Sequence, residues 1–397
     1  MTRRSLDAAV ITALLTLGSG MLYAEDLLGI KLSGEVDTDV NAAVQNGSSV
    51  FAGIIDGKLV FSRKYTTVGL LDFTAQDTAV LSHQTGAAIE TPSLLVNELY
   101  TDVNFGDLFF LRLGKQRLKW GAGFVYNPSD PVNPPKDPTA TRAVREGVPA
   151  LKAELITPVV SVAGFGVIFD QVRESGVGAR VSSSALAGSD LSLSGYWSSS
   201  ESWTASLNAS AAPLYEVPGW DTLQLWFEGG LFGKARYASY AGAAQPGTRE
   251  GIQYSLLAGA TATLPEIRTV VLAEYYHLSE GLGTSELASV YSAASPAWLA
   301  ELARRPARQG KDYLFLSLTQ PSITDSGDPV LDKIGLRASG LLSLTDLSFF
   351  VQAAVITTFV TDSSVELGLN WASGGSQTEF GNAPTSLSGS LTVRVYF

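Results

Sequence analysis

The sequence predicts an all-β fold, a transmembrane antiparallel up-and-down β-barrel of about 18 strands, or about 16 at the lower count. Segments in which apolar and polar residues alternate recur along the whole chain. Hydrophobic residues make up 45% of the chain, charged residues make up only 16%, and 39 residues are glycine. A barrel explains this composition, because apolar side chains face lipid, small and polar side chains face the interior, and charge gathers in loops. The alternative, a soluble sandwich or propeller, would normally carry more surface charge.

The N-terminal residues have the pattern of a secretory signal peptide. Arg3 and Arg4 precede a mostly apolar stretch at 8–17, small residues follow, and we expect cleavage after Ala24. The apolar stretch is shorter than the roughly 18 residues that a membrane-spanning helix needs. We therefore expect residues 1–24 to be a signal peptide and residues 25–397 to form a single outer-membrane β-barrel domain.

The charge and the rare residue types exclude several classes of function. A formal net charge of −11 argues against nucleic-acid binding, because phosphates require a basic face. The chain has no cysteine, which rules out disulfides and thiolate metal sites. Its two histidines, His83 and His277, lie beside no recognisable nucleophile motif. We expect no enzymatic activity, no metal and no cofactor.

Period-two segments define the expected strands, because successive side chains of a strand point to opposite faces. Clear segments and weaker ones together give the expected strand count. The clear segments are 29–40, 57–62, 97–105, 108–118, 150–156, 159–169, 191–197, 223–230, 252–263, 269–277, 313–319, 333–342, 347–358, 365–371 and the terminal strand, and the weaker ones are 65–73, 176–184 and 203–209.

The connections between these segments alternate in length. Short turns are expected on the periplasmic side and long loops on the outside of a transmembrane barrel. The short connections are 105–107, 157–158, 187–190 and 264–267, and the long ones are 76–92, 119–147, 232–250, 280–311 and 372–385.

The terminal segment 387–397 is an alternating strand that ends in an aromatic residue. Leu391, Val393, Val395 and Phe397 share one face, and Arg394 lies on the other, which would line the pore. This ending resembles bacterial outer-membrane β-barrels, whose closing strand ends in phenylalanine. The resemblance implies that Phe397 is an assembly signal read by the barrel-assembly machinery, with outer-membrane lipid as the surroundings. We also expect this strand to pair with the first one and so close the barrel.

The segment 97–147 carries the most specific motif. Its residues follow the form E-x-Y…F-G-x-x-x-x-x-R-x-G-x-Q…W-G, then N-P-x-D…N-P…D-P. This resembles a largely uncharacterised set of porin-like outer-membrane barrels of diderm bacteria. The resemblance implies a pore in the bacterial cell outer membrane, without assigning its cargo.

The hairpin in this segment predicts a charged ladder inside the pore. Glu98, Tyr100 and Asp102 share one strand face, and Arg112 and Gln116 share a face of the next strand. A short turn between the strands would bring Tyr100 opposite Arg112, with the two carboxylates as diagonal neighbours. Two readings stay open. The charges either act on the transported solute or only satisfy one another in a polar interior.

The proline-rich loop 119–147 follows the fifth expected strand. Five prolines make it stiff and exclude it from the sheet. It either folds inward as a constriction loop or forms an outward lid, and a calcium site at Asp130 and Asp137 is a weaker reading. The candidate constriction-loop residues are Asp130, Lys136, Asp137, Arg142, Arg145 and Glu146.

The long connection 280–311 predicts a helix over the barrel mouth or its lumen. Ser295 is a suitable N-cap, Pro296 fits the first helical position, and 297–305 contains strong helix formers. Residues 284–291 are expected to form a preceding helical turn.

Taken together, these features predict an outer-membrane channel for passive diffusion of small polar solutes or ions, narrowed by loop 119–147. The alternative is a substrate-specific transporter for amphipathic or hydrophobic compounds, since Phe124, Val125 and Tyr126 would suit a hydrophobic entry. An adhesin or structural role is a further alternative that the long loops allow. The acidic balance suggests cation preference, and the barrel could be a trimer or a monomer.

Overall fold

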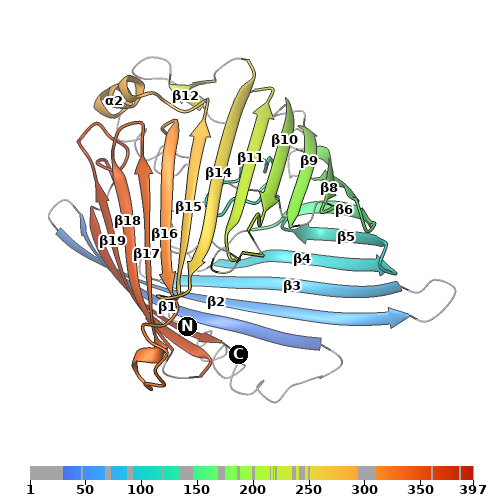
Figure 1. Cartoon of the computed structure of the whole chain (residues 1–397), viewed down its shortest axis with the longest axis horizontal. Coiled ribbons are helices and arrows are strands. Elements are labelled where there is room, and N and C mark those ends of the chain that lie inside the picture. Colours follow the sequence, from blue (N-terminus) through green and yellow to red (C-terminus); the bar gives the residue numbers. More distant parts are fainter. Residues whose placement is uncertain are drawn as a thin grey trace, which may run out of the picture.

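The protein is a closed antiparallel β-barrel whose strands pair in chain order (Figure 1). Its 18-stranded sheet confirms the predicted fold class and strand count. The computed structural model describes residues 30–45, 48–67, 73–86, 93–118, 120–133, 146–168, 175–185, 188–198, 202–214, 216–217, 219, 221–234, 238–240, 246–248, 251–293, 309–358, 361–383 and 386–396. The predicted signal peptide and Phe397 lie outside these residues.

The barrel strands vary in length, and the first four are long. The 20 residues of β2 exceed the roughly 9–11 that a tilted strand needs to cross a bilayer. The strands are β1 (Ile30–Gln45), β2 (Ser48–Thr67), β3 (Phe73–Gly86), β4 (Ser93–Phe105), β5 (Phe109–Gln116), β6 (Val148–Ile156), β7 (Ser161–Val167), β8 (Gly176–Ser183), β9 (Ser189–Ser198), β10 (Ser202–Ala211), β11 (Gln224–Phe232), β14 (Gln253–Leu264), β15 (Thr269–Leu278), β16 (Asp312–Gln320), β17 (Ile334–Ser343), β18 (Phe349–Thr357), β19 (Ser363–Ser373) and β20 (Leu387–Tyr396).

The last strand pairs with the first, as predicted. The β1–β20 register runs from Glu35 opposite Tyr396 to Val44 opposite Leu387. This pairing removes both sheet edges, whose unpaired amide and carbonyl groups would be costly in hydrocarbon.

Alternation along each strand separates an apolar outer face from a polar inner one. On β9 the outward side chains Leu193 and Trp197 are 60% and 57% exposed, whereas the inward Ser192 and Ser198 are 3% and 1% exposed. This arrangement is the reverse of a soluble protein, and it explains the high hydrophobic and low charged content of the sequence.

The prediction was wrong for part of the N-terminal region. Residues 57–62 and 65–73 were expected to be two strands and 76–92 a loop, but the structure has one long β2 and places β3 at Phe73–Gly86. The apolar alternation is broken on β3, because a polar residue lies on the outer face and an apolar one on the inner face. Asp77 faces outward, where it accepts a hydrogen bond from Thr101, and Val80 faces inward and is buried. The predicted number of strands was nevertheless correct, because dividing β2 in two added one strand and missing β3 removed one.

The connections gather at two ends of the barrel. The short turns predicted at 105–107, 157–158, 187–190 and 264–267 correspond to the connections 106–108, 157–160, 184–188 and 265–268, which share one end, termed the turn end. The long connections lie at the other, termed the loop end. The turn end also holds the longer connections 212–223 and 321–333, and the second of these contains the 3-10 helix η2 (Leu331–Lys333).

The loop end carries the remaining elements. The helix α2 (Thr284–Ala293) matches the helical turn expected at 284–291, and the helix expected at 297–305 lies outside the described residues. The loop predicted at 232–250 contains a small antiparallel pair, β12 (Ala238–Tyr240) and β13 (Pro246–Thr248). Among the described residues, no helix is both long and apolar enough to cross a membrane.

Candidate functional site

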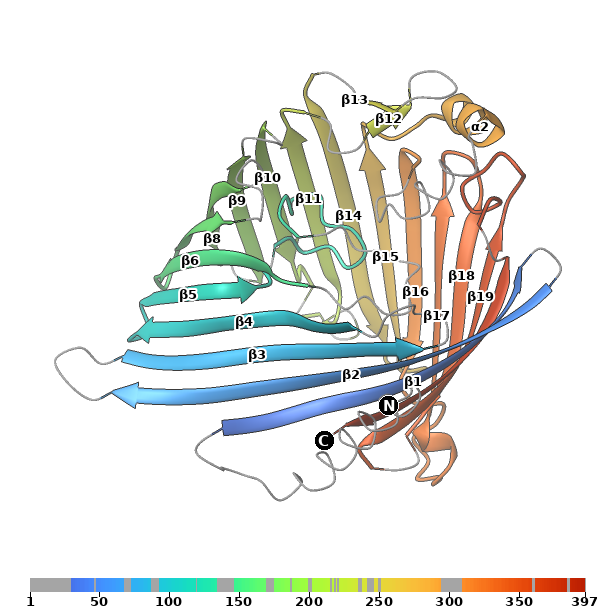
Figure 2. The same ribbon diagram turned by 180° about the vertical axis from the view of Figure 1, so that it is seen from behind.

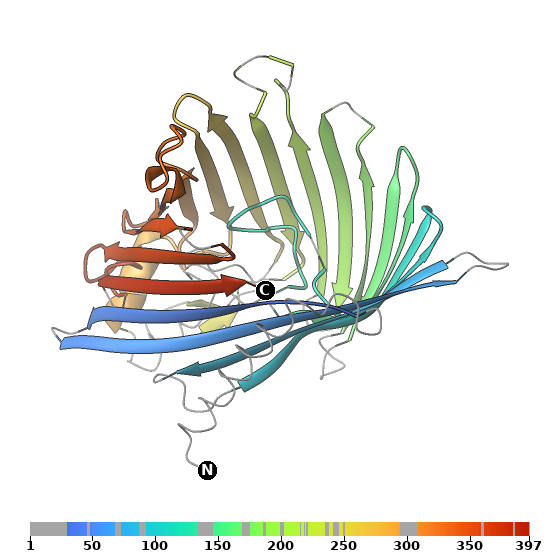
Figure 3. The ribbon, with the colours of Figure 1, turned by 90° about the horizontal axis from the view of Figure 1, so that it is seen from below.

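The segment 120–133, after β5, lies inside the ring of strands (Figures 2 and 3). The asparagines of its two N-P pairs fold it back on itself. Asn127 Nδ2 donates to the Trp120 carbonyl at 2.8 Å, and Asn133 Nδ2 donates to the Leu118 carbonyl at 2.5 Å. Asp130 Oδ1 accepts the N–H groups of Val132 and Asn133 at 3.1 and 2.9 Å. The N-P-x-D…N-P motif therefore builds the shape of this segment, here named the inward loop.

Two buried carboxylates of the barrel wall hold the inward loop. Glu228 on β11 accepts the Gly123 N–H and the Ser129 hydroxyl, the latter at 2.9 Å. Glu274 on β15 accepts the N–H groups of Phe124 and Val125 at 2.5 and 2.7 Å. The glutamates are 0% and 1% exposed, and a carboxylate so buried must be hydrogen-bonded to be tolerated.

A glycine of the W-G motif lets the loop approach Glu228. Gly121 has φ +75°, which L side chains rarely adopt, and a Cβ there would overlap the Glu228 carboxylate. The motif glycine Gly114 is similarly constrained at φ +127°, where a Cβ would overlap the Leu99 carbonyl.

Apolar packing fixes the loop against one side of the interior. The Tyr126 ring stacks on Tyr276 of β15, with centroids 4.1 Å apart and planes 7° apart. Both belong to a buried cluster that includes Trp226 and Tyr313 from the wall. Phe380, from the connection between β19 and β20, joins the same cluster. The inward loop and this second connection thus fill the interior beside β11–β19.

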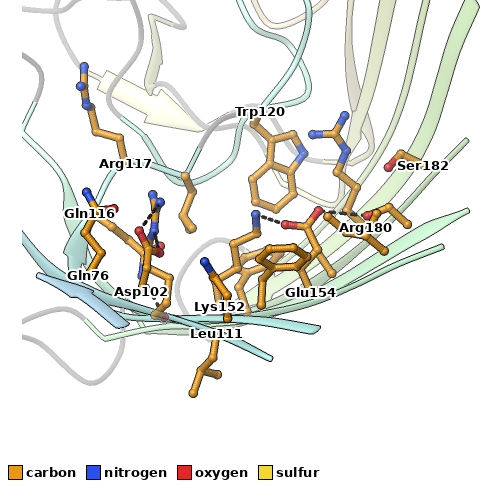
Figure 4. Close-up of a pocket in the computed structure, with 18 residues that line it drawn as sticks. Gln76, Asp102, Leu111, Gln116, Arg117, Trp120, Lys152, Glu154, Arg180 and Ser182 are labelled. Carbon is orange, nitrogen blue, oxygen red and sulfur yellow. Dashed lines mark hydrogen bonds and ion pairs between the residues drawn. The ribbon is translucent and has the colours of Figure 1, made fainter. Parts of the chain in front are cut away.

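The opposite side of the interior keeps an open cavity of about 600 Å³ (Figure 4). It lies against β4–β8 and is bounded on its inner side by Trp120 of the inward loop. The basic side chains that line it outnumber the acidic ones. The charged lining residues are Asp102, Arg112, Arg117, Lys152, Glu154 and Arg180.

The predicted ladder residues lie on this wall, but with a different register. Arg112 is opposite Asp102, not Tyr100, and binds it with two hydrogen bonds of 2.5 and 2.9 Å. Tyr100 lies two residues before Asp102 on the same strand, opposite Gly114. The centroid of its ring is 4.2 Å from Cζ of the Arg112 guanidinium. The prediction was wrong because the three-residue turn was expected at 105–107 and lies one residue later, at 106–108, which shifts the pairing by two positions.

The other ladder residues have local partners. Glu98, 6% exposed, accepts a hydrogen bond from Arg117 Nε at 2.7 Å. Gln116 is fully buried, and its Nε2 donates to the Ala150 carbonyl at 2.9 Å. Arg394 lies away from this wall, at the β20–β1 seam, where it pairs with Asp37.

The sequence reasoning missed three cations of this cavity. Lys152 stands directly opposite Arg112 and forms an ion pair with Glu154 at 2.6 Å. Arg117 and Arg180 complete the set. Lys152 and Glu154 could have been found, because they occupy alternate positions, and hence one face, of a strand that was predicted correctly.

The predicted constriction-loop residues divide into two groups. Asp130 shapes the inward loop, and Glu146 pairs with Lys115 at the end of β5, on the face that carries the outward Leu113. Lys136, Asp137, Arg142 and Arg145 lie outside the described residues. The inward position of 120–133 excludes an outward lid for these residues, because an outward lid could not reach Glu228 and Glu274.

Two glycines leave room for interior aromatic rings to lie against the barrel wall. A Cβ at Gly178 would overlap the Phe165 ring, and a Cβ at Gly259 would overlap the Trp226 indole. The rings therefore lie over the neighbouring strand instead of crossing the lumen.

Comparison with known proteins relates the chain to other barrels by structure alone. No family model and no curated protein matches the sequence. The crystal structure of Acinetobacter baumannii OccAB1 matches with a TM-score of 0.59 and 10% identity, over 93% of this chain and 96% of that one. A triple mutant of the Rhodopseudomonas blastica porin matches with a TM-score of 0.49 and 11% identity, over 93% of this chain and all of that one. The chain therefore shares the fold of OccAB1, an antiparallel β-barrel whose 18 strands here close through β1 and β20.

Proposed function

We propose that this protein is a channel of the bacterial outer membrane, through which small polar solutes or ions diffuse passively. The route runs along the β4–β8 wall, and the inward loop narrows it from the other side. The proposal rests chiefly on the polar, charge-lined cavity that stays open beside the inward loop. The apolar outer surface, suited to lipid, and the fold shared with OccAB1 support it.

The expected mechanism is diffusion through a wet lumen with fixed charges on its wall. The paired charges of Asp102–Arg112 and Lys152–Glu154 favour water and polar solutes over hydrocarbon. No step of this mechanism requires a reaction, so we propose no enzymatic activity.

Planar-bilayer recording of the refolded full chain tests the proposal. Ohmic single-channel steps across a salt gradient are expected, with a conductance that rises with salt concentration. A barrel that is resistant to unfolding in detergent yet gives no conductance would contradict the channel function.

A transporter for amphipathic or hydrophobic compounds is the second candidate. Phe124 of the inward loop is 64% exposed although the loop lies inside the barrel, and the centroid of its ring lies 6.0 Å from that of Trp226. Silence in the bilayer combined with saturable quenching of tryptophan fluorescence by a hydrophobic ligand would favour this candidate over the diffusion channel.

We also propose partners for the barrel, beginning with the lipid that its apolar outer face suits. Outer-membrane lipid would contact the outer face, the barrel-assembly machinery would recognise the closing strand, and the barrel would act as a monomer or trimer. Crosslinking of the protein in native membranes, read by gel mobility, distinguishes the two oligomeric states.

A further inference from the structure

One cation of the cavity differs from the other three. Arg112, Arg117 and Lys152 each form an ion pair with a carboxylate. Arg180 on β8 makes no hydrogen bond or ion pair with any residue in the part of the chain that the structure describes, and its Nε atom is buried. The wall therefore contains one guanidinium whose hydrogen-bonding capacity is unused.

The nearest acid, Glu154, attracts Arg180 electrostatically but forms its hydrogen bonds with other residues. Glu154 Oε2 is bound by Lys152 at 2.6 Å, and Glu154 Oε1 accepts the Ser161 hydroxyl at 3.0 Å. Arg180 is opposite Ala163 on the neighbouring strand, on the inward face, so it points into the cavity (Figure 4). A partly buried guanidinium without a hydrogen-bonded carboxylate is costly, and an incoming anion would relieve that cost.

The surroundings of Arg180 add an apolar face to the cation. Phe165 is its diagonal neighbour across the β7–β8 pair, and Trp120 of the inward loop meets Phe165 edge to face, with ring centroids 4.6 Å apart. Both rings line the cavity with Arg180. A guanidinium presents a planar fork that matches the two oxygens of a carboxylate or phosphate, and the rings suit a nonpolar group attached to it.

We infer that Arg180 binds the oxyanion group of a permeating solute, a small organic carboxylate or phosphate, and that this site makes the channel favour anions. The inference rests on the proposed channel function and deepens it. It is opposed to the cation preference that the acidic composition suggests, because the overall charge of the chain is not the charge of this wall.

Current block in planar bilayers tests the inference, with phenylacetate, acetate and inorganic phosphate as separate probes. Phenylacetate is expected to reduce the current in a saturable manner and more strongly than acetate. In Arg180→Gln the half-blocking concentration should rise about tenfold, the loss typical of one charge-assisted hydrogen bond. Arg180→Lys keeps the positive charge but lacks the planar guanidinium, so its half-blocking concentration should lie between those of the wild type and Arg180→Gln. Stronger block by phosphate than by either carboxylate would assign the site to phosphorylated solutes.

Arg117→Gln is the matched control, because it removes the same charge from the same cavity but from a residue that already has a carboxylate partner. It is expected to shift the reversal potential while leaving the block by phenylacetate intact. Equal loss of block in both Gln variants would overturn the inference, since only net charge would then matter. An open wild-type channel that no probe blocks would also overturn it while leaving the channel function standing, whereas a folded but silent wild type would contradict the channel function itself.

Discussion

Arg394 on the last strand donates a hydrogen bond from Nε to Asp37 Oδ1 on the first strand, at 3.0 Å, across the seam that closes the barrel. The Asp37 side chain is only 4% exposed. Two residues along each strand, Thr392 donates to Asp39 on the same face. The seam is therefore joined inside the barrel by polar side chains as well as by the backbone ladder.

Removing the cation of this pair should destabilise closure. In Arg394→Gln the buried Asp37 carboxylate loses its counter-charge, and the free energy of unfolding should fall by about 1–3 kcal/mol. Urea unfolding of the barrel in lipid vesicles measures this loss. The double variant Asp37→Asn with Arg394→Gln removes both charges and should recover part of the lost free energy of unfolding. Strict additivity of the two single losses would show that the pair is not coupled.

Weakening the attachment of the inward loop should widen the pore. Glu274→Gln replaces one acceptor oxygen with an amide that cannot accept from both Phe124 and Val125, at a cost of about 1–3 kcal/mol. Single-channel conductance is expected to increase, with larger fluctuations. Glu366→Gln is the control, because Glu366 pairs with Arg337 on the wall of β17–β19 and does not contact the loop. Identical conductance in wild type and Glu274→Gln would show that the loop does not limit the current.

The space beside Phe165 should make one glycine intolerant of a side chain. Gly178→Ala would press its methyl group into the Phe165 ring, and such overpacking typically costs about 1–3 kcal/mol. Gly164→Ala on the adjacent strand is the matched control, because a Cβ there meets no atom within 4 Å. Thermal unfolding followed by circular dichroism compares the two. Equal melting temperatures would mean that the wall adjusts without strain.

Deleting Phe397 should impair assembly more than transport. The prediction rests on the resemblance of the terminal strand to closing strands that end in phenylalanine. The amount of folded barrel in the outer membrane should fall, while protein refolded in vitro should conduct normally. A wild-type yield of folded barrel in cells would contradict the role of Phe397 as an assembly signal.

The sequence predicted most of the fold because the barrel is encoded in local alternation. Each strand shows its lipid-facing side directly, as in Leu391, Val393 and Val395 of β20, which are all exposed on the outer face. The failure at β3 has the same origin, since Asp77 on the outer face and Val80 on the inner one break the pattern. Turn placement limited the rest, because pairing Arg112 with Asp102 depends on the turn lying at 106–108 and not at 105–107.

The sequence by itself predicted the class of barrel, its closure and the residues of the motif hairpin, and it gave the strand count through two errors that cancelled. Only the tertiary structure decided where the inward loop lies and which cation of the wall is left without a hydrogen-bonded carboxylate. The loop is held by contacts between Gly123 and Glu228, 105 residues apart, and between Val125 and Glu274, 149 residues apart. The unpaired state of Arg180 likewise depends on which carboxylates the register gives to its neighbours. Such pairings depend on how the strands align around the closed barrel, a long-range property that alternation within one strand does not carry.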